Sequence, residues 1–113
     1  MGKGNRLGEF EEVVLLALAS FEDSAYGVEV FDTLARITGR EGSITGVYVA
    51  LSRLEDKGYV KSYLGKATAQ RGGRAKRFFT LQPAGAEVLK RSREAMNALW
   101  RGARLHPLLE DGS

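Results

Sequence analysis

The chain has 113 residues, of which 17 are basic and 14 are acidic, so its formal net charge at pH 7 is +3. This length predicts one compact domain with at most a short appendage, and a hydrophobic content of 43% is typical of a globular protein. The chain lacks cysteine and has a single histidine, which excludes disulfides and argues against zinc sites and Ser-His-Asp catalysis. We therefore expect neither an enzyme nor a bound metal or cofactor.

The sequence also argues against a membrane protein. The longest apolar run, residues 13–19, is far shorter than the roughly 18 residues that a membrane helix needs. Residues 1–6 are basic but are not followed by the apolar core and cleavage site of a signal peptide, and we expect them to be flexible. A cytoplasmic protein without a membrane partner is the expectation.

Two helices are predicted in the first third of the chain. Residues 7–20 place Leu7, Phe10, Val14 and Ala17 at helical spacing, with acidic residues near the positive N-terminal end. After a connector at residues 21–24, a second helix is expected over residues 26–38. Gly39 is placed to end this helix in a left-handed conformation.

A third helix is predicted over residues 44–57, with Ser43 as its N-cap and Gly58 as its stop. One side carries the apolar residues Ile44, Val47, Leu51 and Leu54. The other side carries short polar groups, an arrangement that suits a helix fixed in a core and exposed to a partner.

A hairpin with a basic tip follows the third helix. Residues 59–64 and 77–81 are rich in β-branched and aromatic residues and predict two strands. Residues 57–86 contain seven Lys or Arg residues and no Asp or Glu, whereas the rest of the chain has ten basic residues against all 14 acidic ones. This polarity favours double-stranded DNA as a partner, although a solvated basic loop is the alternative.

A fourth helix is expected to begin at Pro83 and to end near Arg104, before Pro107. Leu89, Ser92, Met96, Leu99 and Ala103 alternate at gaps of three and four residues, which indicates a seam for another helix. The seam predicts a homodimer through residues 83–105, and residues 106–113 are expected to form a tail. The alternative is that the seam packs on the first helix of its own chain.

The order of these elements predicts a mainly α fold with a small β-hairpin, a winged helix-turn-helix over residues 7–82 followed by a C-terminal dimerisation helix. Its third helix would enter the major groove, and its wing would contact the adjacent backbone. The candidate DNA-binding residues are Ser43, Thr45, Tyr48, Val49, Ser52 and Arg53 on the helix and Arg71, Gly72, Gly73, Arg74 and Lys76 in the wing. The candidate dimer contacts are Leu89, Met96, Leu99 and Trp100.

Several of these residues have structural alternatives. Tyr48 can instead pack at the border of the helix, Thr45 can assist the cap, and Arg53 can pair with a nearby acid such as Glu55. Gly27 and Gly58 are expected to form turns.

Four segments resemble PadR-type transcriptional regulators in order and spacing: LGEFEEVVLLAL (7–18), AYGVEV (25–30), SITGVYVALSRLEDKG (43–58) and RGGRAKRFFTL (71–81), the last followed by Pro83-Ala84-Gly85. The resemblance implies a homodimeric winged-helix repressor that reads DNA with its third helix. It is similar to the smaller subfamily with a single C-terminal helix. Val49 stands where the family often has proline, and Gln82 stands where it usually has threonine.

The resemblance also implies a use for Trp100, because some small PadR relatives stack planar cationic drugs on a tryptophan of the terminal helix. Ordinary interface packing is the alternative for this residue. A small-molecule sensor centred on Trp100 and a winged-helix module that binds another protein are the two alternative functions.

Overall fold

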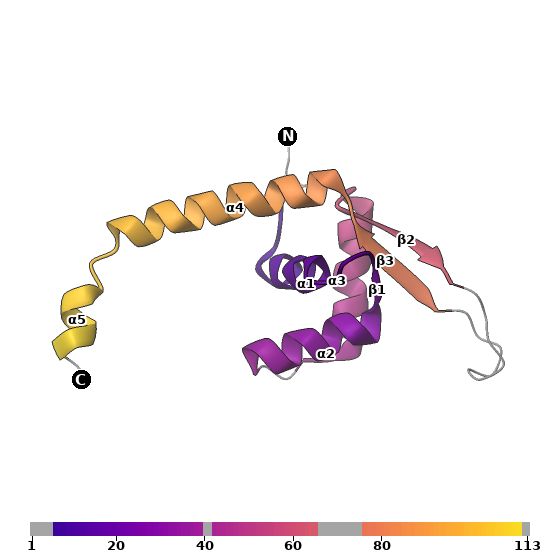
Figure 1. Ribbon diagram of the computed structural model, residues 1–113, viewed down its shortest axis with the longest axis horizontal. Helices are drawn as coiled ribbons and strands as arrows, with labels where there is room; N and C mark the ends of the chain where they lie inside the picture. The colour runs from indigo at the N-terminus through magenta and orange to yellow at the C-terminus, as the bar shows by residue number, and fades with distance from the viewer. Residues whose placement is uncertain (1–5, 40–41, 66–75, 112–113) are drawn as a thin grey trace.

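The computed structural model describes residues 6–39, 42–65 and 76–111. Its elements, in chain order, are α1 (Glu9–Ala19), β1 (Ala25–Tyr26), α2 (Gly27–Thr38), α3 (Ile44–Asp56), β2 (Val60–Leu64), β3 (Arg77–Leu81), α4 (Pro83–Gly102) and α5 (His106–Asp111). Helices α1 to α3 form a body from which the β2–β3 hairpin projects on one side and α4 on the other (Figure 1). The predicted fold class, mainly α with a small hairpin, is confirmed.

The core lies where the three helices meet the inner face of the sheet. Its fully buried side chains include Val14 of α1, Val30 of α2 and Leu51 of α3, which belong to the predicted apolar stripes, and Leu15 of α1, which does not. Burying a side chain of this size contributes about 1.5–3 kcal/mol. The core therefore fixes α3 by its inner face and leaves its outer face exposed.

The sheet contains one strand that the sequence did not predict. Its order is β1-β3-β2, and both pairings are antiparallel. In β1, Ala25 pairs with Phe79, and Tyr26 pairs with Phe78. The expected connector thus ends in a short strand that joins the start of α2 to the hairpin.

Local hydrogen bonds set the ends of the helices. The Ser43 hydroxyl accepts a hydrogen bond from the Gly46 N–H at 2.9 Å, which confirms Ser43 as the N-cap of α3. Gly39 and Gly58 have φ angles of 70° and 82°, so both occupy the left-handed region that glycine favours. Gln82 precedes α4 without a side-chain cap, and its N–H instead donates to the Tyr59 carbonyl at 2.9 Å.

The two halves of α4 differ in their contacts. In the first half, Val88 and Leu89 pack against the core, and the Ser92 hydroxyl lies 2.6 Å from Glu12 Oε2 of α1. The second half extends away from the body, as Figure 1 shows. Beyond it the expected tail contains a short helix, α5, so the prediction for this segment was wrong.

A charged contact joins α1 to the end of α3. Lys57 Nζ lies 2.6 Å from Glu11 Oε1, and it also donates to the Arg6 carbonyl. Glu11 Oε1 accepts a second hydrogen bond, from the Gly8 N–H at 3.0 Å. Burial raises the pKa of Glu11, but the hydrogen bonds from Lys57 and Gly8 and the charges of Lys57 and Arg53 outweigh it and hold this pKa below its usual value.

Replacing Glu11 with glutamine is expected to lower the free energy of unfolding at pH 7 by about 1–3 kcal/mol, because Lys57 loses its charged partner. Because the folded-state pKa of Glu11 is lowered, the carboxylate contributes fully above its unfolded pKa, and this contribution disappears as pH falls through the folded value. Urea unfolding of both proteins from pH 7 downwards should show the difference shrinking below about pH 4.5. Glu9→Gln, in the same turn but exposed, is the control. A difference that is constant with pH would contradict this assignment.

Candidate nucleic-acid interface

The outer face of α3 presents a row of exposed side chains. Thr45, Tyr48, Val49, Ser52 and Arg53 are all exposed, whereas the inner face is buried. Their types match what base edges and phosphates require: hydroxyl groups, one guanidinium, and an apolar group that can contact a thymine methyl. The structure thus places five of the six predicted helix residues on one face, and the sixth, Ser43, is the N-cap.

Tyr48 is held in place by a close contact with α2. Its ring lies so near Gly27 that a Cβ on this glycine would be 2.3 Å from Cζ and 2.6 Å from the hydroxyl oxygen. The expectation that Gly27 forms a turn was wrong: its φ is not positive, and it is the first residue of α2. Gly27 is needed because only a residue without a side chain lets the Tyr48 ring approach. Tyr48 is still 40% exposed, so it combines a packing contact with an accessible surface.

Arg53 keeps its guanidinium exposed near the C-terminal end of α3. The alternative partner Glu55 is engaged elsewhere: its Oε2 accepts hydrogen bonds from the Ser62 hydroxyl at 2.7 Å and from the Ser62 N–H at 3.2 Å. Among the residues that the structure describes, no ion pair involves Arg53. The side chain is therefore available to a partner.

The same hydrogen bonds fix the hairpin relative to α3. Ser62 of β2 bonds Glu55 of α3, and Arg77 Nη1 of β3 donates to the Ser62 hydroxyl at 2.8 Å. Both strands of the hairpin are thus tied to the helix that would read DNA. The orientation of the wing follows from this short polar chain.

An aromatic row with one cation crosses the sheet near the end of β2 and the start of β3. The rings of Tyr26, Phe78 and Tyr63 come from three neighbouring strands, with 5.7 Å between centroids in each adjacent pair. Lys76 Nζ lies 3.5 Å from the centre of the Tyr26 ring, a cation–π geometry. Tyr26 directly precedes Gly27, the residue that the Tyr48 ring approaches.

Only part of the predicted wing lies within the described residues. Arg71, Gly72, Gly73 and Arg74 lie outside them, whereas Lys76 is described and half-buried over Tyr26. The positive charge of Lys76 is therefore placed over Tyr26 of β1.

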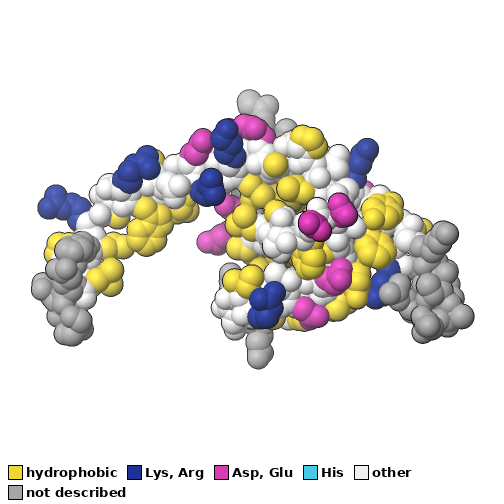
Figure 2. Space-filling view, in the orientation of Figure 1, with side chains coloured by type: hydrophobic (Ala, Val, Ile, Leu, Met, Phe, Trp, Pro, Cys, Tyr) yellow, Lys and Arg dark blue, Asp and Glu magenta, His cyan; other side chains and the backbone are white. Residues whose placement is uncertain are grey.

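The candidate dimer residues fall into two groups. Leu89 is half-buried against the core and helps to line a groove of about 440 Å³ between α1 and α4. Met96, Leu99 and Trp100 are 52%, 69% and 61% exposed. In Figure 2 hydrophobic side chains follow the side of α4 that faces the space between α5 and the helical body. The first half of the seam thus packs within its own chain. In the second half Met96 also lines the groove between α1 and α4, whereas Leu99 and Trp100 do not.

Other kinds of site find no support in the described part of the chain. Its Asp, Glu and His residues form no group that could hold a metal ion. None of its helices combines the length and the apolar character required to cross a membrane.

A tri-helical body with a capped third helix and an antiparallel hairpin defines a winged helix-turn-helix, a class of DNA-binding domain. The model of the transcriptional regulator PadR-like family matches residues 15–91. The chain therefore belongs to this family, and it is a DNA-binding transcription regulator rather than a member of an enzyme family.

Solved structures of bacterial regulators share this fold. A transcriptional regulator from Clostridium thermocellum is similar with a TM-score of 0.66 and 25% identity, over 80% of this chain and 82% of that one. A PadR family regulator from Clostridium difficile has a TM-score of 0.69 and 20% identity, over 90% and 99%. One from Eggerthella lenta has a TM-score of 0.68 and 23% identity, over 90% and 87%. No curated protein matches the sequence significantly.

Proposed function

We propose that this protein is a repressor that binds a pseudo-palindromic DNA operator as a homodimer. Each copy would place α3 in a major groove, with the two grooves about one helical turn apart on the same side of the duplex. The observation that carries the proposal is the second half of α4, where Met96, Leu99 and Trp100 expose apolar surface that the protomer itself does not cover. A two-fold interface would bury this surface in both copies at once.

The roles proposed on α3 follow from the chemistry of its exposed face. Arg53 would contact a guanine edge or a phosphate, Thr45 and Ser52 would hydrogen-bond, and Val49 would contact a thymine methyl. The hydroxyl of Tyr48 would contact the adjacent DNA backbone. Ser43 already uses its hydroxyl to cap α3, so its remaining contribution to DNA would be to aim the helix N-terminus at a phosphate.

The wing would bind phosphates and would not read sequence. Arg71 and Arg74 would supply cations to the phosphates, and Gly72 and Gly73 would allow the main chain to approach the DNA backbone closely. Lys76, held over Tyr26, would add a fixed cation beside strand β1. In this proposal the wing contributes affinity for any DNA duplex, and α3 contributes discrimination between DNA sequences.

Arg53→Ala is expected to reduce the preference for operator over random duplex by about tenfold, because a bidentate base contact contributes about 1–3 kcal/mol. Arg74→Ala should instead weaken binding to both duplexes equally and make the salt dependence shallower by about one unit. Fluorescence anisotropy over a salt series separates the two effects. Arg91→Ala, an exposed position on α4 that pairs with Glu87, is the control. Equal losses on both duplexes for Arg53→Ala would exclude base reading.

Gly27→Ala is expected to lower DNA affinity about tenfold while changing the free energy of unfolding by less than about 1 kcal/mol. The added Cβ displaces the Tyr48 ring, and this ring is exposed enough to move without unpacking the core. DNA titrations and urea unfolding measure the two quantities. In a Tyr48→Ala background the glycine substitution should have no further effect on DNA affinity. An additive loss there would contradict the contact as the cause.

A second function is favoured by one observation at the end of α4. Trp100 lines a shallow groove of about 260 Å³ together with Met96, Leu99, Ala103 and Leu105. We propose that a planar cationic effector stacks on this indole between the two subunits. Quenching of tryptophan fluorescence by planar dyes, lost on dilution to monomers, would support it. Quenching unaffected by dilution would place the dye outside an interface.

Binding to DNA also tests the competing proposal, that the protein is a module that binds another protein. Gel shifts with genomic fragments should give discrete complexes at moderate salt. If the protein does not bind DNA at low ionic strength, the proposed repressor function is wrong and a protein partner is favoured.

A further inference from the structure

The start of α4 is anchored to α3 through one residue that precedes β2. The Tyr59 N–H donates to the Leu54 carbonyl of α3 at 2.9 Å, and the Tyr59 carbonyl accepts the Gln82 N–H at 2.9 Å. Gly85, in the first turn of α4, approaches the same carbonyl so closely that a Cβ there would lie 2.4 Å from its oxygen. This end of α4 is therefore a fixed point relative to α3.

A second polar contact holds α4 seven residues beyond Gly85. The Ser92 hydroxyl donates to Glu12 Oε2 of α1 at 2.6 Å, in a partly buried position. Seven residues of α-helix span about 10 Å, so the two contacts together define the direction of α4. Within the described part of the chain, no side-chain hydrogen bond or ion pair beyond Ser92 joins α4 to another element.

Apolar packing alone does not fix this direction. The groove of about 440 Å³ between α1 and α4 is lined by Leu16, Leu89 and Met96, among others, so the two helices do not interdigitate fully along it. Apolar burial has no preferred direction, whereas a hydrogen bond to a carboxylate is short and about twice as strong as one between neutral groups. The contact between Ser92 and Glu12 is therefore the one that sets the angle of α4 against α1.

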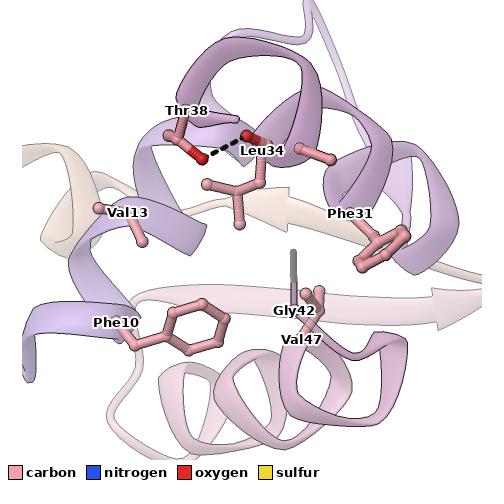
Figure 3. A pocket seen from close by; sticks show the side chains of 8 residues that line it. Phe10, Val13, Phe31, Leu34, Thr38, Gly42 and Val47 are labelled. Carbon is pink, nitrogen blue, oxygen red and sulfur yellow. Dashed lines mark hydrogen bonds between the residues drawn. The ribbon is translucent and has the colours of Figure 1, made fainter. Parts of the chain in front are cut away.

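Helix α1 in turn belongs to the same rigid body as α3. Both helices contribute side chains to the shared core, and Phe10 and Val13 of α1 line a small cavity together with residues of α2 and α3 (Figure 3). Neighbouring residues of a helix point about 100° apart, so Glu11 reaches Lys57 at the end of α3 while Glu12 reaches α4. A tilt of α4 against α1 is thus a tilt against the helix that would read DNA.

We propose that Glu12 and Ser92 are positioning residues: their hydrogen bond fixes the tilt of α4 and thereby sets the spacing of DNA half-sites that the dimer accepts. This inference rests on the proposed repressor, in which the second half of α4 joins the two copies. A tilt of about 8° at Gly85 moves the far end of α4, about 25 Å away, by about 3.5 Å. One base pair of DNA is about 3.4 Å long, so a small change of tilt matches a change of one base pair in spacing.

A distance measurement without DNA tests the proposal. Because the chain lacks cysteine, Asp56→Cys at the exposed end of α3 allows one spin label to be attached to each copy. Pulsed dipolar spectroscopy should give one narrow distance distribution for this protein, and a broader or shifted one when Glu12→Ala or Ser92→Ala is added. Glu12→Gln keeps an acceptor oxygen and should retain the narrow distribution. Identical distributions in all variants would overturn this inference alone, whereas the lack of any distance between labels would overturn the proposed dimer as well.

DNA duplexes with altered spacing provide a second readout. The unchanged protein should prefer one half-site spacing over its one-base-pair neighbours by about tenfold, and Ser92→Ala should reduce this preference to about threefold or less, with unchanged affinity for a single half-site. Ser20→Ala is the matched control, because the Ser20 hydroxyl bonds the Ala17 carbonyl within α1. A Ser92→Ala protein that keeps the original spacing preference, or that no longer forms dimers, would contradict a positioning role.

Discussion

Leu99→Glu is expected to convert the proposed dimer into monomers and to lower its affinity for a two-site DNA duplex by about a hundredfold or more. Leu99 is 69% exposed in the protomer and lies in the second half of α4. In a two-fold dimer the substitution would bury a carboxylate without a partner, twice, and a monomer would retain only one of two DNA half-sites. Sedimentation equilibrium gives the mass, and anisotropy with the same preparation gives the affinity.

Ile37→Glu is the matched control for this prediction. Ile37 is 66% exposed, so the same change is made at equal exposure, but on α2. It should leave both the mass and the DNA affinity unchanged. A Leu99→Glu protein that remains a dimer would exclude this part of α4 from the interface, whatever its DNA affinity.

Gly85→Ala is expected to lower the free energy of unfolding by about 1–3 kcal/mol, although alanine normally stabilises a helix relative to glycine. A Cβ at this position would lie 2.4 Å from the Tyr59 carbonyl oxygen and 2.8 Å from a methyl carbon of Leu81. The carbonyl belongs to the backbone and accepts the hydrogen bond from the Gln82 N–H, so it has little freedom to move. Helix α4 would have to shift away from the sheet. Urea or thermal unfolding measures the loss.

Gly102→Ala provides the control on the same helix. No atom lies within 4 Å of a Cβ built there, and its φ is not positive. This substitution should be neutral or stabilising by up to about 1 kcal/mol. If both substitutions have the same effect, the close approach at Gly85 is not the cause.

Much of the fold could be predicted because the spacing of the apolar residues and the residues that mark helix ends agree along the chain. The apolar stripes identify most of the buried faces, although Phe10 of α1 and Ile37 of α2, both expected in a stripe, are exposed. Ser43, Gly39 and Gly58 mark helix ends by chemistry that depends on only a few neighbouring residues. The two longer strands were found from β-branched and aromatic content. Helix boundaries differ from the predictions by only one or two residues at each end, the normal extent of fraying.

The elements that escaped prediction depend on contacts between distant residues. Strand β1 has only two residues, too few for an alternating pattern, and exists because Ala25 and Tyr26 pair with β3. The role of Gly27 depends on Tyr48, twenty-one positions away, and a glycine before a helix reads locally as a turn. The sequence predicts a tail where α5 lies because Pro107 is a stop signal for the preceding helix, but proline is also accepted in the first turn of a new helix.

The residues of the candidate site could be predicted from the sequence, but their arrangement in space could not. Exposure of Thr45, Ser52 and Arg53 follows from the helical period alone. The placement of Lys76 over Tyr26, and the chain from Glu55 through Ser62 to Arg77, require the sheet register and therefore the fold. The contact of Ser92 of α4 with Glu12 of α1 likewise joins distant residues, and the repeat in α4 does not reveal it.

Selection of bound DNA from a random pool tests the central proposal most directly, that two copies present two α3 helices to one duplex. The predicted result is a two-fold symmetric motif. Its half-sites lie about one helical turn apart, which is about 10–10.5 base pairs of B-DNA. Enrichment of a single asymmetric site, or of no sequence at all, would contradict it.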